Sequence, residues 1–201
     1  RHDAQQRREL LNAADLVILC LPDDAARQAV GVVTRPDTRI IDASTAHRTA
    51  PGWVYGLPEL EGQRRMIAEA ARVANPGCYP TGFILLLRPL IEAGLLPADY
   101  PVVTYAVTGY SGGGKSMIRD FENTPAADLA NIAARAKNLP LGHKHLPEMQ
   151  KIAGLTQAPH FLPIVGNFYQ GMLVFVPLFR SGMSTGADAQ TVHAALASYY
   201  A

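Results

Sequence analysis

The stretch Arg72-Val73-Ala74-Asn75-Pro76-Gly77-Cys78-Tyr79-Pro80-Thr81 decides the fold. Its first three residues predict a brief strand, and a Pro-Gly turn follows. The apolar segment 81–93 then predicts a helix that ends at Gly94 and that Pro89 kinks or breaks. A strand that passes through a tight turn into a helix is the repeating unit of a parallel α/β sheet.

The residues before this stretch repeat the same unit. Apolar runs at 15–20 and 39–42 predict strands of a buried parallel sheet. Helical patterns alternate with these runs, at 5–14, 22–33 and 59–71. The alternation predicts a doubly wound parallel α/β domain, and Cys20, inside the first run, is expected to lie in its apolar core.

The residues after the stretch follow a different pattern. Runs of β-branched and aromatic residues predict strands at 102–108, 161–165 and 171–179, and we expect the last two to belong to an antiparallel sheet. Helices are predicted at 116–122, 147–154 and 188–200, and the Ala-rich segment 126–136 is expected to be helical or a loop. The change of pattern predicts a domain boundary between residues 75 and 102. Ligands of open α/β sheets bind at the carboxyl ends of strands, often facing a second domain, so we expect Cys78 at such an edge.

Composition excludes several classes of protein. The 201 residues are 48% apolar and 17% charged, with a net charge of +1. Disorder is not expected, and neither nucleic acid nor a membrane surface is expected as a partner. No apolar run reaches the ~18 residues of a membrane span, and no secretory signal opens the chain. Two cysteines do not make a disulfide scaffold, so we expect a reducing, cytoplasmic compartment.

Cys78 is the candidate nucleophile. The partial positive charge at the start of a helix favours a thiolate, and the free N–H groups of the first turn can hold a developing oxyanion. Gly77 permits a tight turn and close approach of a substrate. From residue type alone, a loop cysteine without a role remains an equal alternative.

A second candidate segment is His143-Lys144-His145-Leu146-Pro147-Glu148. A histidine beside a carboxylate in the first turn of a helix suits a general base with an orienting group. The two histidines could also bind zinc together with Cys78, or serve only the structure. We expect no metal, because a lone His-x-His with one cysteine lacks the usual paired spacing of zinc ligands.

The segment Gly109-Tyr110-Ser111-Gly112-Gly113-Gly114-Lys115-Ser116 matches the phosphate-binding pattern G-x-x-x-x-G-K-S. A nucleoside triphosphatase is therefore an alternative function. Two observations argue against this alternative. The segment is not followed by an apolar strand ending in an Asp that could hold a magnesium ion, and a triphosphatase would not explain the Cys78 and His143 segments. The milder interpretation is a Gly-rich turn at a helix start that binds an anion or packs against a cofactor.

Together these motifs resemble a known family. The segments 73–82, 109–115, 143–148 and 168–172, with Asp42-Ala43-Ser44-Thr45-Ala46-His47-Arg48 and 55–60, are similar to the short type of the N-acetyl-gamma-glutamyl-phosphate reductases. The resemblance covers almost the whole chain. It implies an α/β fold: a Rossmann-like parallel-sheet domain at 1–77, and at 78–201 an α+β catalytic and dimerisation domain like that of glyceraldehyde-3-phosphate dehydrogenase. Both domains are expected to be incomplete, and the Gly-rich loop that holds the cofactor phosphates in the family is expected upstream of Arg1.

The resemblance also implies a reaction. The family uses NADPH to convert N-acetyl-gamma-glutamyl phosphate into N-acetylglutamate semialdehyde and phosphate, in arginine biosynthesis, as a homo-oligomer for which we expect a dimer or a tetramer. Cys78 would form a thioester and His143 would be the acid/base. The residues expected to bind the substrate are Arg48, Lys115, His145 and Glu148. Those expected to contact NADP are Leu21, Pro22, Ser44, Asn75, Ser111, Gly112 and Gly113. A Cys-dependent acyl transferase or hydrolase remains an alternative, and a non-catalytic binding module is the least expected one.

Overall fold

A computed structural model describes residues 3–129, 131 and 133–201. The chain divides into two compact units, Arg1–Thr81 and Gly82–Ala201. The division falls in the first turn of helix α4 (Cys78–Glu92). We describe each unit by itself.

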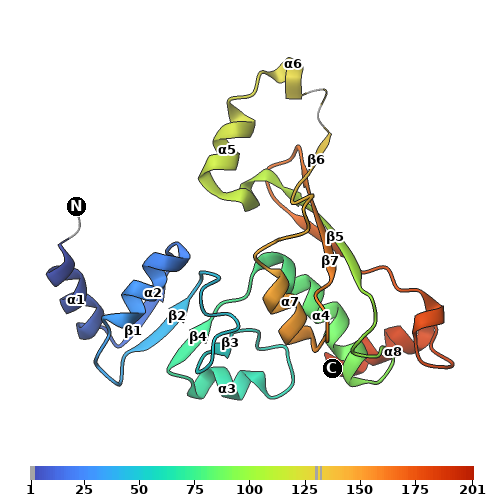
Figure 1. Ribbon diagram of the computed structural model, residues 1–201, viewed down its shortest axis with the longest axis horizontal. Coiled ribbons are helices and arrows are strands. Elements are labelled where there is room, and N and C mark those ends of the chain that lie inside the picture. Colours follow the sequence, from blue (N-terminus) through green and yellow to red (C-terminus); the bar gives the residue numbers. More distant parts are fainter. Residues whose placement is uncertain (1–2, 130, 132) are drawn as a thin grey trace. The chain divides into compact units, whose positions relative to one another are not determined.

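The first unit is built on a four-stranded sheet in the order β1-β2-β4-β3, and every pair of neighbouring strands is parallel (Figure 1). The strands are β1 (Leu16–Leu19), β2 (Arg39–Asp42), β3 (Val54–Tyr55) and β4 (Arg72–Ala74). The predicted parallel α/β architecture is confirmed. β3 was not predicted, because two residues carry no periodic signal.

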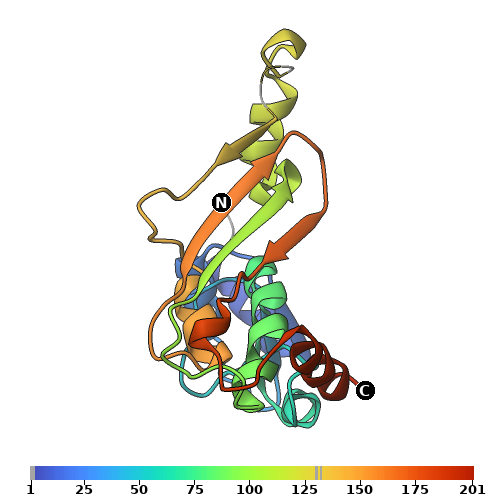
Figure 2. The same ribbon diagram turned by 90° about the vertical axis from the view of Figure 1, so that its right-hand side faces the viewer.

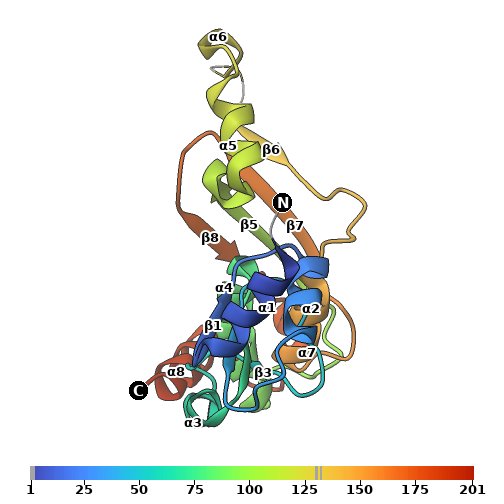
Figure 3. The ribbon, with the colours of Figure 1, turned by 90° about the vertical axis from the view of Figure 1, so that its left-hand side faces the viewer.

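Two helices cover one face of this sheet. They are α1 (Ala4–Ala13), which Asp3 caps by accepting bonds from two N–H groups of the first turn, and α2 (Asp23–Gly31). Apolar side chains of both helices pack on Val17, Leu19 and Ile40, and Figure 3 shows the helices side by side. The third helix of the unit is α3 (Gln63–Glu69).

Cys20 is exposed, so the prediction that it lies in the core is wrong. Burial alternates along β1, with Leu16 51% and Ile18 62% exposed. The reason is that α1 and α2 cover only one face of this strand, which is an edge strand in the described residues. A continuous apolar run therefore does not place every side chain in the core, because successive residues of a strand point to opposite faces.

The second unit holds a four-stranded sheet in the order β6-β7-β5-β8. Its central strands, β5 (Val103–Gly109) and β7 (His160–Gly166), are parallel, and the two outer strands, β6 (Ala134–Ala136) and β8 (Met172–Phe175), are antiparallel to them. The expected antiparallel sheet is thus wrong, because β5 lies between the two later strands instead of β7 pairing with β8. β6 lies in the segment predicted as helix or loop, of which residues 130 and 132 lie outside the described residues.

Helices cover one face of this second sheet (Figure 2). α4 continues past Pro89 to Glu92, so the predicted break does not occur, and Arg88 of α4 donates a hydrogen bond to the carbonyl of Ile152 in α7. The other helices are α5 (Gly114–Glu122), α6 (Ala126–Leu129), α7 (Leu146–Ala153) and α8 (Ala189–Tyr199), with 3-10 turns η1 (Tyr110–Gly113) and η2 (Arg180–Gly182). No helix in the described part of the chain is both long and apolar enough to span a membrane.

Candidate functional site

Cys78 is exposed, carries a free thiol and is the first residue of α4. The carbonyl of Gly77 accepts bonds from both the N–H and the hydroxyl of Thr81, which close the first turn of the helix. Gly56 packs against the turn so closely that an added Cβ would lie 3.1 Å from the carbonyl oxygen of Ala74. The strand, the turn and the helix therefore hold Cys78 at the carboxyl edge of the parallel sheet.

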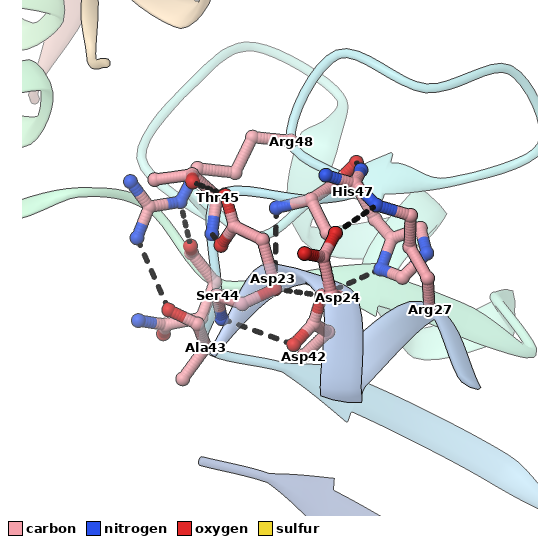
Figure 4. Close-up of polar contacts among 11 residues, drawn as sticks. Asp23, Asp24, Arg27, Asp42, Ala43, Ser44, Thr45, His47 and Arg48 are labelled. Carbon is pink, nitrogen blue, oxygen red and sulfur yellow. Dashed lines mark hydrogen bonds and ion pairs between the residues drawn. The ribbon is translucent and has the colours of Figure 1, made fainter. Parts of the chain in front are cut away.

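A buried polar network lies at the same edge, in the loop after β2 (Figure 4). The carboxylate of Asp42 is 0% exposed and accepts bonds from the backbone N–H and the hydroxyl of Ser44. One of its oxygens also lies 2.6 Å from Nδ1 of His47, whose ring stacks on Trp53. A buried carboxylate is stable only when its oxygens are satisfied in this way, so Asp42 fixes the conformation of the loop.

Helix α2 holds this loop from the other side. Asp23, in the first turn of α2, accepts bonds from the backbone N–H and the hydroxyl of Thr45. Arg27 donates to the carbonyl of Ala46 at 3.3 Å. The loop that follows β2 is therefore bound on both sides by charged groups (Figure 4).

Arg48 ends the loop and is buried, with 9% of its surface exposed. Its Nε donates to the carbonyl of Asn75 at 2.9 Å, and its Nη2 donates to the carbonyl of Ala43 at 3.2 Å. We expected this residue to bind the substrate, but these two donors are directed at the backbone. The geometry therefore links the loop after β2 to the turn that carries Cys78.

Four of the residues expected to contact the cofactor follow three adjacent strands of the first sheet. They are Leu21 and Pro22 after β1, Ser44 after β2 and Asn75 after β4. The carboxyl ends of parallel strands meet at one edge, which is where nucleotide cofactors bind to such sheets. The structure thus brings these residues to the edge that holds Cys78.

In the second unit, His143 lies just before α7 and is half-buried. Its Nδ1 accepts the backbone N–H of His145 at 3.2 Å, and its ring meets the ring of Phe161 edge to face. His145 is the N-cap residue of α7, and Glu148 is buried in the first turn of that helix. A neutral imidazole with an acceptor at Nδ1 carries its proton on Nε2, so His143 can offer an N–H donor there.

The pKa of His143 lies below its ordinary value of 6.5, first because burial disfavours the cation and second because Lys144 repels it. In the folded protein His143 is therefore neutral at pH 7, and its contribution to stability, fully present above about pH 6.5, is lost as pH falls through the lowered pKa. We expect the NMR signal of the His143 ring to titrate below pH 6.5. A His143 midpoint at or above 6.5 would contradict the expectation.

The Gly-rich turn folds differently from a phosphate loop. Tyr110–Gly113 forms a 3-10 turn, and Lys115 is an exposed residue in the first turn of α5. The N–H groups of Tyr110 and Ser111 donate to the carbonyls of Phe168 and Tyr169, and that of Gly114 donates to Ser111. Because backbone acceptors take these N–H groups, they cannot surround a triphosphate.

The second sheet keeps this turn apart from His143. Ser111, Gly112, Gly113 and Lys115 follow the carboxyl end of β5, which pairs with the end of β7 at Gly166. His143 contacts Phe161, near the start of β7. Gly166 lies five positions after Phe161 along β7, a distance of about 17 Å at the strand rise per residue. Within the second unit, therefore, the structure does not bring Lys115 together with His143, His145 and Glu148.

Sequence reasoning gave no role to Asp42, His47 or Asp23. One available signal was the charged residue at the end of the apolar run 39–42, since a carboxylate in such a run must find partners. Among the described residues, no group of three or more His, Cys, Asp or Glu side chains is arranged to hold a metal ion.

Two family models match the chain. The semialdehyde dehydrogenase NAD-binding domain matches residues 2–70, and the semialdehyde dehydrogenase dimerisation domain matches residues 78–201. The second match alone covers more than half of the chain.

Named relatives and solved structures agree with these matches. The chain is 52% identical to N-acetyl-gamma-glutamyl-phosphate reductase of Burkholderia lata and 51% identical to N-acetyl-gamma-glutamyl-phosphate reductase 2 of Pseudomonas putida. Each match covers 100% of this chain and 64% of the relative, so the chain spans less than two thirds of the relatives' length. Aspartate semialdehyde dehydrogenase II from Vibrio cholerae has the same fold, with a TM-score of 0.70 at 17% identity over 94% of this chain and 61% of that one.

The parallel sheet with Cys78 at its carboxyl edge, the two family models and these relatives lead to one assignment. The chain belongs to the semialdehyde dehydrogenase family.

Proposed function

We propose that the protein reduces N-acetyl-gamma-glutamyl phosphate to N-acetylglutamate semialdehyde with NADPH, a step of arginine biosynthesis. The observation that carries the proposal is Cys78, an exposed thiol on the first residue of a helix at the carboxyl edge of a parallel sheet. The proposed substrate is supported by the names of relatives that are 51–52% identical over the whole chain.

Cys78 acts as the nucleophile in this proposal. Its thiolate attacks the acyl carbon, the bond to the phosphate oxygen breaks, and a thioester forms as inorganic phosphate leaves. An acyl phosphate is an activated acyl donor, so a thiolate suffices for this step. The N–H groups of the first turn of α4 favour the negative charge that develops on the acyl oxygen.

We propose that His143 donates a hydrogen bond to the acyl oxygen of the substrate when the thioester is reduced. Because its Nδ1 accepts the N–H of His145, the neutral ring holds a proton on Nε2 and donates a hydrogen bond from there. The lowered pKa keeps the ring neutral, so His143 acts as a donor without a cationic form. His145, the N-cap residue of α7, and Glu148, in the first turn of that helix, are both buried, and we propose that they line the substrate pocket.

The edge formed by Leu21, Pro22, Ser44 and Asn75 would hold part of the cofactor. This edge fits a dinucleotide, because it unites the carboxyl ends of three adjacent parallel strands, and the NAD-binding family model covers residues 2–70. When bound, NADPH supplies the hydride that takes the thioester to the aldehyde level. We also propose that the protein prefers NADP over NAD and that Ser111, Gly112 and Gly113 contact the cofactor. Lys115 is proposed to bind an anion at a place separate from His143.

The substrate is tested by running the reaction backwards on the full-length protein. With NADP, phosphate and N-acetylglutamate semialdehyde, we expect NADPH absorbance to appear. The matched competitor is aspartate semialdehyde, for which we expect kcat/KM to be lower by about 100-fold or more, because it carries a free amino group in place of the acetamide of the proposed substrate. A preference for aspartate semialdehyde would refute the assignment.

We also propose that two copies associate through the open face of the second sheet. Val103, Leu162, Leu173 and Phe175 lie on one face of the paired strands and are between 38% and 63% exposed. A contiguous apolar face of this kind marks an interface, and the dimerisation-domain model covers it. Leu173→Glu is expected to leave a monomer in sedimentation, whereas Leu139→Glu, an exposed leucine outside the sheet, should not. A monomeric wild-type protein at micromolar concentration would contradict this interface.

A further inference from the structure

The turn that carries Cys78 begins where two neighbouring strands separate. The parallel ladder between β2 and β4 ends with the N–H of Asn75, which donates to the carbonyl of Asp42 at 2.8 Å. Beyond this bond the chain diverges into the loop 43–48 and the turn 76–78. The next carbonyl on each side, of Ala43 and of Asn75, accepts a bond from Arg48 instead. Arg48 thus joins the two strand ends after the ladder has stopped.

Arg48 can do this only if its own backbone is held in place. Asp42 holds His47, its neighbour in sequence, at 2.6 Å, and it holds Ser44 through two bonds of 2.7 and 3.0 Å. Trp53 stacks on the His47 ring with centroids 4.2 Å apart. Figure 4 shows these polar contacts, and Asp42, Ser44 and His47 are all buried, so the loop that presents Arg48 has one well-defined conformation.

We propose that Arg48 is a positioning residue for the Cys78 nucleophile, and that the Asp42–His47 pair holds Arg48 in place. This inference rests on the proposed function. The guanidinium sets the direction of the Asn75 carbonyl, and therefore the path of Pro76-Gly77 into the first turn of α4. It gives Arg48 a role different from direct contact with the anionic substrate.

The choice of arginine follows from the geometry. Nε and Nη2 of one planar guanidinium reach two carbonyls on two strands at the same time. A lysine ammonium keeps the charge but is a single point on a flexible stem, so it cannot fix both carbonyls. Arg48→Lys therefore separates the loss of geometry from the loss of charge.

The test measures the thiol directly. In the full-length protein with Cys20→Ser, which leaves Cys78 as the only thiol among the residues described here, iodoacetamide reports the reactivity of Cys78. We expect Arg48→Lys to slow alkylation about tenfold and to lower kcat about 100-fold, the scale of a displacement of ~1 Å, while KM for phosphate changes less than about threefold. His47→Asn, which leaves Arg48 intact, should slow alkylation by a smaller factor.

Arg27→Lys is the matched control, because Arg27 donates to the same loop but not to Asn75. It should alkylate like the parent protein. If Arg48→Lys alkylates at the parent rate and raises KM for phosphate, Arg48 binds substrate and the inference is overturned. If Arg48→Lys does not fold, the test rests on His47→Asn. Alkylation of that variant at the rate of the parent protein would also overturn the inference. A parent protein without reductase activity would refute the proposed function instead, since alkylation does not depend on turnover.

Discussion

Replacing Cys78 with serine is expected to lower kcat of the proposed reductase reaction by at least about 10⁴-fold, the scale of losing a covalent nucleophile. A serine hydroxyl is almost the same size as the thiol, and Cys78 is exposed, so the fold should not change. The hydroxyl remains protonated at neutral pH, however, and the start of α4 cannot supply the missing nucleophilicity. The acyl transfer to the enzyme should therefore fail before any hydride is transferred.

The measurement is the reverse assay with NADP, phosphate and N-acetylglutamate semialdehyde, together with mass spectrometry of the protein. With the aldehyde and NADP but no phosphate, the wild-type protein should gain the mass of the acyl group, and Cys78→Ser should not. Cys20→Ser is the control, because that second exposed thiol should leave both results unchanged. A Cys78→Ser enzyme with more than about a tenth of wild-type activity would show that Cys78 is not the nucleophile.

Much of the first unit could be predicted from the sequence because its signals are local. Short apolar runs between amphipathic helices specify parallel strands, and a strand, a Pro-Gly turn and a helix specify where Cys78 lies. The second unit was harder, because the order of strands in a mixed sheet depends on contacts between distant segments. β5 pairs with β7 on one side and with β8 on the other, and no periodicity in these segments reports that order.

The side-chain network around the site could be predicted least. Arg48 appears in the sequence as one of several cations, and its charge suggested a substrate anion. Two of its hydrogen bonds go instead to backbone carbonyls, which have no side-chain identity for a sequence to reveal. The prediction that Cys20 is buried was wrong for a related reason. The composition of 15–20 indicates an apolar strand, but it does not indicate that only one face of the strand is covered.

Gly109→Ala is expected to destabilise the second unit by about 3 kcal/mol, the upper range for inserting a methyl group into a packed site. Gly109 ends β5, and its N–H donates to the carbonyl of Gly171. An added Cβ would lie 2.6 Å from the carbonyl oxygen of Tyr169 and 2.7 Å from the N of Gln170. These are backbone atoms, so no side-chain rotation relieves the contact.

The loop 167–171 can move away only by losing its bonds to the turn after β5. Those bonds, Tyr110 N–H to Phe168 and Ser111 N–H to Tyr169, hold the Gly-rich turn at the start of α5. The matched control is Gly31→Ala at the end of α2, where no atom lies within 4 Å of the new Cβ, and we expect its stability to change by less than about 0.5 kcal/mol. Thermal unfolding should show a Tm lower by roughly 10 °C for Gly109→Ala. Equal Tm values for the two variants would mean that the loop 167–171 adjusts at no cost, and that its packing does not fix the Gly-rich turn.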